Sequence, residues 1–200
     1  MGEPSPKREE SDFPDTSAAF PRLTVEQMDA LGSKGQRRKV APGEVLFRAG
    51  EPCDEFYVIL SGSIDIVEDH GCDSERTLST HGAGRFLGEL NLLSGQPEFV
   101  TAAAREPSEV LAVPVSELRS LMGRDTNLSD AILRACIARR SMLIGRGSGL
   151  RILGSRYSPD TKRLREFANR NRIPHRFIDL EVEEEAEHIL RDLQVAPSET

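Results

Sequence analysis

The chain has 200 residues, enough for one large domain or for an ordinary domain followed by part of a second one. It carries 26 Lys and Arg against 33 Asp and Glu, and the resulting formal charge of −7 argues against a general nucleic-acid-binding surface, which is normally basic. No apolar run approaches the roughly 20 residues of a membrane span, and the N-terminus lacks the apolar core of a signal peptide. We therefore expect a cytoplasmic protein with no nucleic acid and no membrane among its partners.

The cysteines are few and scattered. An odd set at positions 53, 72 and 136 fits neither a disulfide framework nor a close-spaced metal site, and it is typical of a reducing cytosol. A redox enzyme built on these thiols would need a second thiol close in sequence, which none of them has. We expect no catalytic residue, no metal and no cofactor in this chain, with each cysteine acting as a small, partly apolar side chain.

The N-terminal part begins with a tail. Residues 1–20 are rich in Pro, Ser, Glu and Asp and poor in apolar side chains, which predicts a disordered or weakly docked segment. Thr24 and Gln27 then form a capping-box pattern that predicts a short helix ending near Gly32. The first folded domain is expected to span residues 21–144.

Short apolar or alternating runs follow from Arg38 to Val113, separated by turn signals at regular spacing. The turn pairs are Pro42-Gly43, Ala49-Gly50, Ser61-Gly62 and His70-Gly71. Many short strands between glycine turns predict a mainly β sandwich or jelly roll. His70 and His81 flank a turn-rich segment of it, and we expect both side chains to face solvent.

Two helices are predicted to close this domain, over residues 116–121 and 129–144. The second carries an apolar stripe that can pack on the roll or on a second copy of the chain, made by Ile132, Leu133, Cys136, Ile137 and Leu143. We expect Arg134, Arg139 and Arg140 of this helix to lie on a solvated polar face. The GRGSG stretch at residues 145–149 is the clearest linker candidate in the chain.

The remainder, residues 150–200, changes to an α/β pattern. A short strand at residues 150–153, a charged helix at 159–171, a strand at 176–180 and a helix at 183–193 make a partial β-α-β-α arrangement. A two-stranded sheet with open edges supports itself poorly, so we expect a fragment of a longer fold. The acidic residues 181–187 are expected to form a solvated first turn of the last helix.

The first domain resembles a known family. The stretch PGEVLFRAGEPCDEFYVILSGSIDIVED at residues 42–69, with FLGELNLLSG at 86–95, is similar to the cyclic nucleotide-binding domain family over residues 22–144. The resemblance implies a β-roll with flanking helices, the last of which serves as a lid or as a dimer seam. A jelly roll of the metal-binding cupin type is the alternative, but it would need more histidines than His70 and His81.

In that family, a glutamate at the position of Glu89 accepts a hydrogen bond from the ribose, and a short helix opening at Gly88 presents amides to the cyclic phosphate. The arginine that should follow Pro97 is replaced by Glu98, and Phe99 and Val100 replace two small residues. The resemblance thus identifies a degenerate pocket made by Gly88, Glu89, Leu90, Glu98, Phe99, Val100 and Thr101. Without a phosphate cation, Glu89 has the alternative role of complementing the N–H groups at the start of the short helix.

Energetics argue against a cyclic nucleotide here. Losing the charge-assisted bond costs about 1.5–3 kcal/mol, and a carboxylate about 4 Å from the phosphate adds about 4 kcal/mol of repulsion at an effective dielectric of about 20. Together these effects would reduce a micromolar affinity to an unmeasurable one. The alternative is a working sensor of a cyclic nucleotide or another small ligand, with Arg85 or Arg105 relocated to the phosphate.

Residues 150–193 resemble the opening half of a glutaredoxin-like thioredoxin fold. Where active members carry Cys-x-x-Cys, this chain has Ser155 and Ser158, so dithiol chemistry cannot run there. The order of the two modules resembles the N-terminal part of a bacterial fusion with a thioredoxin reductase. This resemblance implies FAD and NADPH sites in a missing C-terminal part, because this chain has no G-x-G-x-x-G after a strand.

We therefore expect a non-catalytic regulatory or assembly region that contacts its own reductase region, with a possible homodimer through residues 129–144. A transcription factor is the remaining rival, since such factors join these rolls to a helix-turn-helix. The strand-helix-strand-helix order after Gly149 contains no recognition helix and ends in acidic residues, which argues against it.

Overall fold

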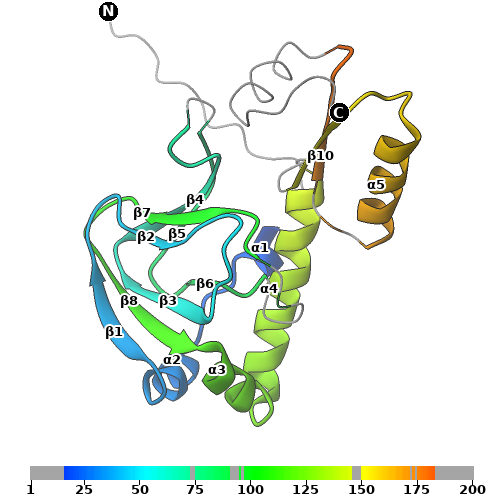
Figure 1. Ribbon diagram of the computed structural model, residues 1–200. Coiled ribbons are helices and arrows are strands. Elements are labelled where there is room, and N and C mark those ends of the chain that lie inside the picture. The colour runs from blue at the N-terminus through cyan, green and yellow to red at the C-terminus, as the bar shows by residue number, and fades with distance from the viewer. Residues whose placement is uncertain are drawn as a thin grey trace, which may run out of the picture.

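A computed structural model of the chain describes residues 16–72, 75–90, 95, 97–145, 150–171, 173 and 175–182. These residues form an antiparallel β-roll with helices at its side, followed by a smaller β-α-β unit (Figure 1). The mainly β first domain predicted from the turn spacing is confirmed.

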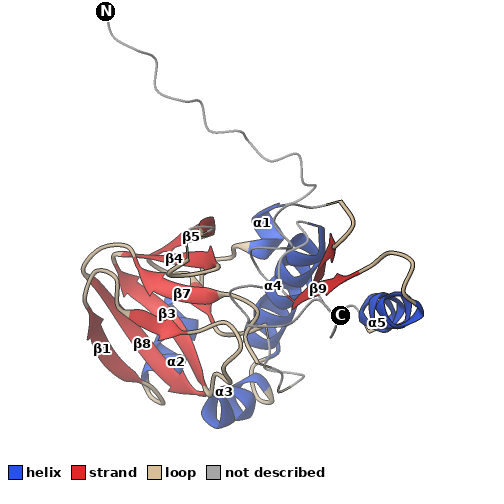
Figure 2. Cartoon of the chain, turned by 45° about the horizontal axis from the view of Figure 1, so that its top comes forward, coloured by secondary structure: helices blue, strands red, loops and turns tan. Residues whose placement is uncertain are grey.

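Two four-stranded antiparallel sheets make the roll (Figure 2). The first sheet has the order β1-β8-β3-β6, formed by Gln36–Val40, Ser108–Pro114, Glu55–Ser61 and Phe86–Leu87. The second has the order β2-β7-β4-β5, formed by Val45–Phe47, Thr101–Ala104, Ser63–Glu68 and Arg76–Gly82. Because β3 and β4 are joined through Gly62 and lie in different sheets, the chain turns from one sheet into the other at this glycine.

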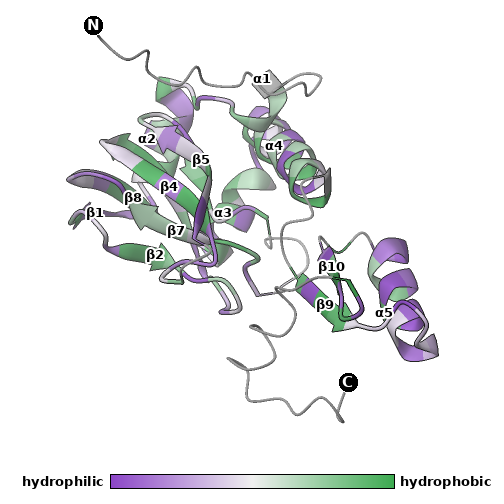
Figure 3. Cartoon of the chain, turned by 90° about the horizontal axis from the view of Figure 1, so that it is seen from above, coloured by the Kyte–Doolittle hydropathy of each residue, from purple (hydrophilic) through white to green (hydrophobic). Residues whose placement is uncertain are grey.

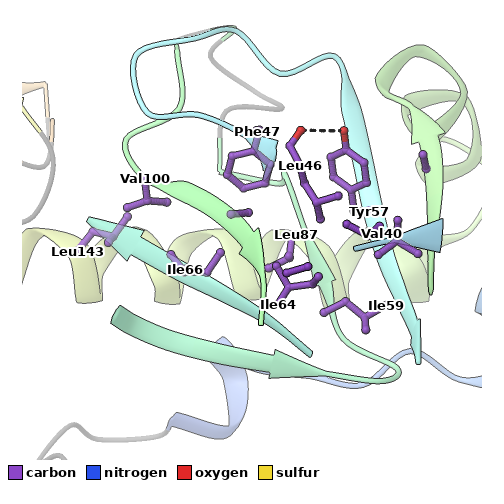
Figure 4. Close-up of a cluster of buried hydrophobic side chains, with 14 residues drawn as sticks. Val40, Leu46, Phe47, Tyr57, Ile59, Ile64, Ile66, Leu87, Val100 and Leu143 are labelled. Carbon is purple, nitrogen blue, oxygen red and sulfur yellow. Dashed lines mark hydrogen bonds between the residues drawn. The ribbon is translucent and has the colours of Figure 1, made fainter. Parts of the chain in front are cut away.

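The sequences of strands β3 and β8 are almost continuously apolar because the other sheet covers one face of each strand and the helices cover the other. Side chains alternate between the faces of a strand, so neighbouring residues enter different cores. In β3, Tyr57 and Ile59 pack between the sheets, whereas Phe56 and Val58 face the helices. The core between the sheets is drawn in Figure 4, where the Tyr57 hydroxyl donates a hydrogen bond to the Leu46 carbonyl at 3.2 Å.

Four helices accompany the roll in the part of the chain that the structure describes: α1 (Thr16–Ala19), α2 (Val25–Gly32), α3 (Val115–Met122) and α4 (Thr126–Gly145). Helices α2, α3 and the N-terminal half of α4 cover the outer face of the first sheet, whereas α1 packs against α4. The capping box predicted for α2 is confirmed, since the Thr24 hydroxyl accepts from the Gln27 amide and the Gln27 side chain accepts from the Thr24 amide. Helix α4 begins three residues before its predicted start because the Asp125 carboxylate caps the amides of Asn127 and Leu128.

The C-terminal unit consists of β9 (Leu150–Gly154), α5 (Pro159–Arg170) and β10 (His175–Asp179). Strands β9 and β10 pair in parallel, as a β-α-β crossover requires. The Ser158 hydroxyl caps α5 by accepting from the Thr161 amide, which confirms the predicted helix start. Helix α5 is largely hydrophilic (Figure 3).

One sequence prediction about the fold is wrong, and several others concern residues that lie outside the described part of the chain. The tail prediction for residues 1–20 is wrong at its end, because residues 16–19 form α1 and Ala19 is buried; residues 1–15 lie outside the described residues. Most of the short helix expected after Gly88, four of the five linker residues and the last helix at 183–193 also lie outside them. Among the described residues, no helix is both long enough and apolar enough to cross a membrane.

Candidate functional site

The site lies where the short strand β6 leaves the first sheet. Residues Gly88, Glu89 and Leu90 follow β6 directly, and their backbone path depends on Gly88, which has a φ of 85°. A Cβ atom at this position would lie 2.6 Å from the carbonyl oxygen of Glu55 in β3. Glycine is therefore required for two reasons, a left-handed backbone and a close approach to the neighbouring strand.

Glu89 is paired with an arginine of helix α4. Its side chain is 1% exposed, and its Oε1 accepts a hydrogen bond from Arg139 Nη1 at 2.6 Å. The Arg139 side chain is 8% exposed, so the ion pair is almost completely removed from water. The carboxylate that the family resemblance assigns to a ribose is thus engaged by the protein's own guanidinium.

Arg139 is held by further contacts that tie three segments together. Its Nε donates to the Ala19 carbonyl at 2.6 Å and its Nη1 donates to the Phe86 carbonyl at 2.9 Å. The guanidinium also lies 4.9 Å from the ring centre of Phe86 and 5.6 Å from that of Phe20. The expectation of a solvated Arg139 is wrong, whereas Arg134 on the same helix is exposed and pairs with Asp130 at 2.9 Å.

His81, on β5, is a second buried polar residue of this site. Its side chain is 1% exposed, so the expectation that it faces solvent is wrong. The ring packs edge-on against Phe20 at 5.2 Å, and Nε2 lies 3.1 Å from the Ser79 hydroxyl. Burial, with smaller contributions from the positive charges of Arg139 and Arg85, lowers the pKa of His81 to about 2.

We predict that this histidine makes the fold sensitive to acid. Because the folded pKa lies below the unfolded value of about 6.5, the unfolded chain binds the extra proton and stability falls as the pH drops below 6.5. Between pH 7 and pH 5 the loss attributable to His81 should be about 2 kcal/mol. Urea unfolding at the two pH values should show this loss in the wild type and in His70→Gln, and a smaller one in His81→Gln. An equal loss in all three would contradict the assignment.

The other predicted site residues, Glu98 to Thr101, lie in the segment that leads into β7 and at the start of that strand. Glu98 is 2% exposed, and its backbone is anchored by hydrogen bonds with Gly50 and Glu51 at 2.8 and 2.9 Å. Thr101 is buried and its hydroxyl accepts from the Ala49 amide at 3.1 Å, so it supports the β2 segment. Phe99 is half-buried against the core between the sheets, with the Arg140 guanidinium 5.8 Å from its ring centre.

A cavity of about 50 Å³ lies among these residues. Of the predicted site residues, Gly88, Glu89, Leu90, Glu98 and Val100 line it, and Phe99 and Thr101 do not. The sequence did not indicate the other polar lining residues, Ser79, His81 and Arg139, nor Phe20. Pockets that hold drug-sized ligands have about 300–1,000 Å³, whereas this volume holds a few water-sized groups.

The two arginines considered as substitutes for the phosphate cation are engaged elsewhere. Arg85 donates to the Thr80 carbonyl at 3.4 Å and lies 5.5 Å from the ring centre of Phe20. Arg105 lies 3.8 Å from the Asp65 carboxylate. Neither contributes to the described lining of the cavity.

Comparison with known proteins agrees with this architecture. The sequence model of the "Cyclic nucleotide-binding domain" family matches residues 37–125. The chain is 32% identical over 124 residues to the cyclic AMP receptor protein of Thermus thermophilus, covering 62% of this chain and 57% of that protein. It is 26% identical over 120 residues to a cyclic nucleotide-gated potassium channel of Mesorhizobium japonicum, covering 60% of this chain and 31% of the channel.

A solved structure is similar as well. The crystal structure of the Thermus thermophilus catabolite activator protein matches with a TM-score of 0.51 and 32% identity, over 60% of this chain and 56% of that one. The chain therefore spans little more than half of this relative, and less of the channel. Taken with the roll and its closing helices, these matches identify residues 37–125 as a cyclic nucleotide-binding domain.

Proposed function

We propose that this chain is a non-catalytic regulatory region whose nucleotide pocket no longer binds cyclic nucleotides. The observation that carries the proposal is the buried ion pair between Glu89 and Arg139, at 2.6 Å, inside a cavity of about 50 Å³. A ribose would have to break this pair, and a phosphate would meet the buried carboxylate of Glu98. Breaking a buried pair by removing one partner typically costs about 3–5 kcal/mol, which opposes nucleotide entry.

Calorimetric titration with cyclic AMP and cyclic GMP tests this proposal. We expect no heat of binding up to millimolar nucleotide for the wild type. Glu98→Arg should also give a flat trace, because restoring the phosphate cation leaves Glu89 occupied by Arg139 and the cavity small. Micromolar binding by the wild type would instead establish the second candidate, a working sensor. The similarity to the cyclic AMP receptor protein of Thermus thermophilus and to the cyclic nucleotide-gated channel of Mesorhizobium japonicum favours this candidate.

We propose that the C-terminal unit is the start of a Cys-less thioredoxin-like domain that precedes a flavin- and NADPH-dependent reductase in a longer protein. The parallel β9-α5-β10 crossover supports this, as do the two serines at the turn before α5. Both serines have structural partners, since Ser158 caps α5 and the Ser155 hydroxyl donates to Glu181 at 2.8 Å. Oxidation of NADPH by the isolated chain would contradict the non-catalytic assignment.

We further propose that α4 forms a homodimer seam. Its side away from the roll exposes Ile137 by 66% and Ile144 by 41%, while Ile132 and Leu143 of the same helix are buried. Burying such apolar residues against a second copy is favourable. Light scattering should therefore give twice the monomer mass for the wild type and a monomer for Ile137→Lys, with Arg134→Lys as the matched control. A wild-type monomer at high micromolar concentration would contradict the seam.

A further inference from the structure

The cavity contains polar atoms that the described protein atoms do not satisfy. Glu89 Oε2, Arg139 Nη2 and His81 Nδ1 are all buried, and none has a hydrogen-bond partner among the described residues. As whole residues, Glu89, Arg139 and His81 are 1%, 7% and 1% exposed, and all three line the same cavity. Leaving a buried polar group without a partner is costly, so atoms of this kind mark a place for a bound group.

Their hydrogen-bonding character restricts what the cavity can hold. Arg139 Nη2 can only donate, and the ionised Glu89 carboxylate can only accept. An anion offers no donor to Glu89, and a cation offers no acceptor to Arg139. A primary amide offers a carbonyl oxygen and an N–H₂ group side by side, and it meets both requirements at once.

The charges of the lining point in the same direction. Its charged residues, among those described, are Glu89, Glu98 and Arg139, two carboxylates against one guanidinium. His81, whose pKa is lowered by burial, adds no positive charge at neutral pH. An anion therefore enters a site with an excess of negative groups and pays the desolvation cost as well, whereas a neutral molecule avoids both.

Resting on the proposed loss of cyclic nucleotide binding, we propose that the cavity is a site for a small, uncharged primary amide. The Arg139 Nη2 group donates to the amide oxygen, and Glu89 Oε2 accepts from the amide nitrogen. The apolar lining residues, including Leu87, Val100 and Leu143, surround the carbon part of the molecule. A volume of about 50 Å³ limits the ligand to a few non-hydrogen atoms.

Three planar molecules of the same shape test the proposal. Acetamide, acetate and guanidinium each have four non-hydrogen atoms in a Y arrangement but carry charges of zero, minus one and plus one. Each is titrated into isotope-labelled chain by NMR, following the Arg139 Nε–H and His81 ring signals. The exposed Arg134 Nε–H is the control signal. Acetamide should shift the two buried signals saturably, with a Kd no tighter than about 0.05 mM for so small a ligand. Acetate and guanidinium should bind at least about tenfold more weakly.

Two variants sharpen the test. Glu89→Gln removes the acceptor-only carboxylate and should abolish the preference for acetamide over acetate. That variant also disturbs a buried ion pair, so a second variant, Phe20→Ala, is needed. It removes part of the cavity wall and leaves Glu89 Oε2 and Arg139 Nη2 in place. It should admit the larger isobutyramide, which the wild type should exclude.

The outcomes separate this proposal from the one on which it rests. A flat acetamide titration with a flat cyclic AMP trace overturns the amide site and leaves the proposed function standing. Acetate binding as tightly as acetamide overturns the charge argument and with it the proposal. Binding of cyclic AMP overturns the proposed function itself, whatever acetamide does.

Discussion

Replacing Arg139 by Met should lower the free energy of unfolding by about 3–5 kcal/mol, the usual effect of leaving one member of a buried ion pair alone. The substitution leaves the Glu89 carboxylate, 1% exposed, without its 2.6 Å partner. It also removes the donors to the Ala19 and Phe86 carbonyls, both of which lose a short hydrogen bond. Denaturant unfolding of the two proteins measures the difference.

The double variant Arg139→Met with Glu89→Leu should recover much of the loss, because neither charge is then buried. Arg134→Met is the matched control on the same helix. Its ion pair with Asp130 is exposed on both sides, so its removal should cost about 0.5 kcal/mol or less. If Arg139→Met behaves like Arg134→Met, the buried pair does not hold α4 and α1 on the roll.

Gly88→Ala should be the most damaging single-methyl change near the site, with an expected loss of about 2–5 kcal/mol. A φ of 85° is strained for any residue with a Cβ, at about 1–2 kcal/mol, and the new methyl would lie 2.6 Å from the Glu55 carbonyl oxygen. Relieving that overlap must move β6 away from β3, an overpacking cost of about 1–3 kcal/mol.

Gly50→Ala isolates the backbone contribution. Gly50 has nearly the same φ of 83°, but nothing lies within 4 Å of its ideal Cβ position. It should therefore lose only about 1–2 kcal/mol in the same denaturant experiment. Equal losses at both glycines would show that the contact with β3 is relieved without cost.

Much of the fold could be predicted because the sequence features that determine its strands, turns and helix starts each involve residues only a few positions apart. Turn glycines, alternating runs and the Thr24 and Ser158 caps each act within a few residues, and the structure agrees with them. The predicted helix at 129–144 and the β-α-β order after residue 150 are also confirmed, with small shifts at their ends.

The site was harder to predict because its central contact joins residues 50 positions apart. The sequence nevertheless contains one signal for this contact. Arg139 lies three residues after Cys136 and four before Leu143, so helical spacing already places it on the buried stripe of α4. A charged residue on such a stripe requires a buried partner of opposite sign, and Glu89 was a carboxylate whose expected ribose partner the replacement at position 98 had put in doubt. His81 gave no such signal, since it is buried by Phe20 from a segment expected to be disordered.

Alternate residues of β3 belong to two different cores and are therefore expected to evolve under separate packing constraints. Val58 belongs to the layer under the helices and Ile59 to the space between the sheets, although the two are adjacent in the chain. Ile59 instead shares its surroundings with Val110, its register partner in β8. Substitutions at positions 58 and 59 should therefore be tolerated independently, whereas positions 59 and 110 should constrain each other as the protein evolves.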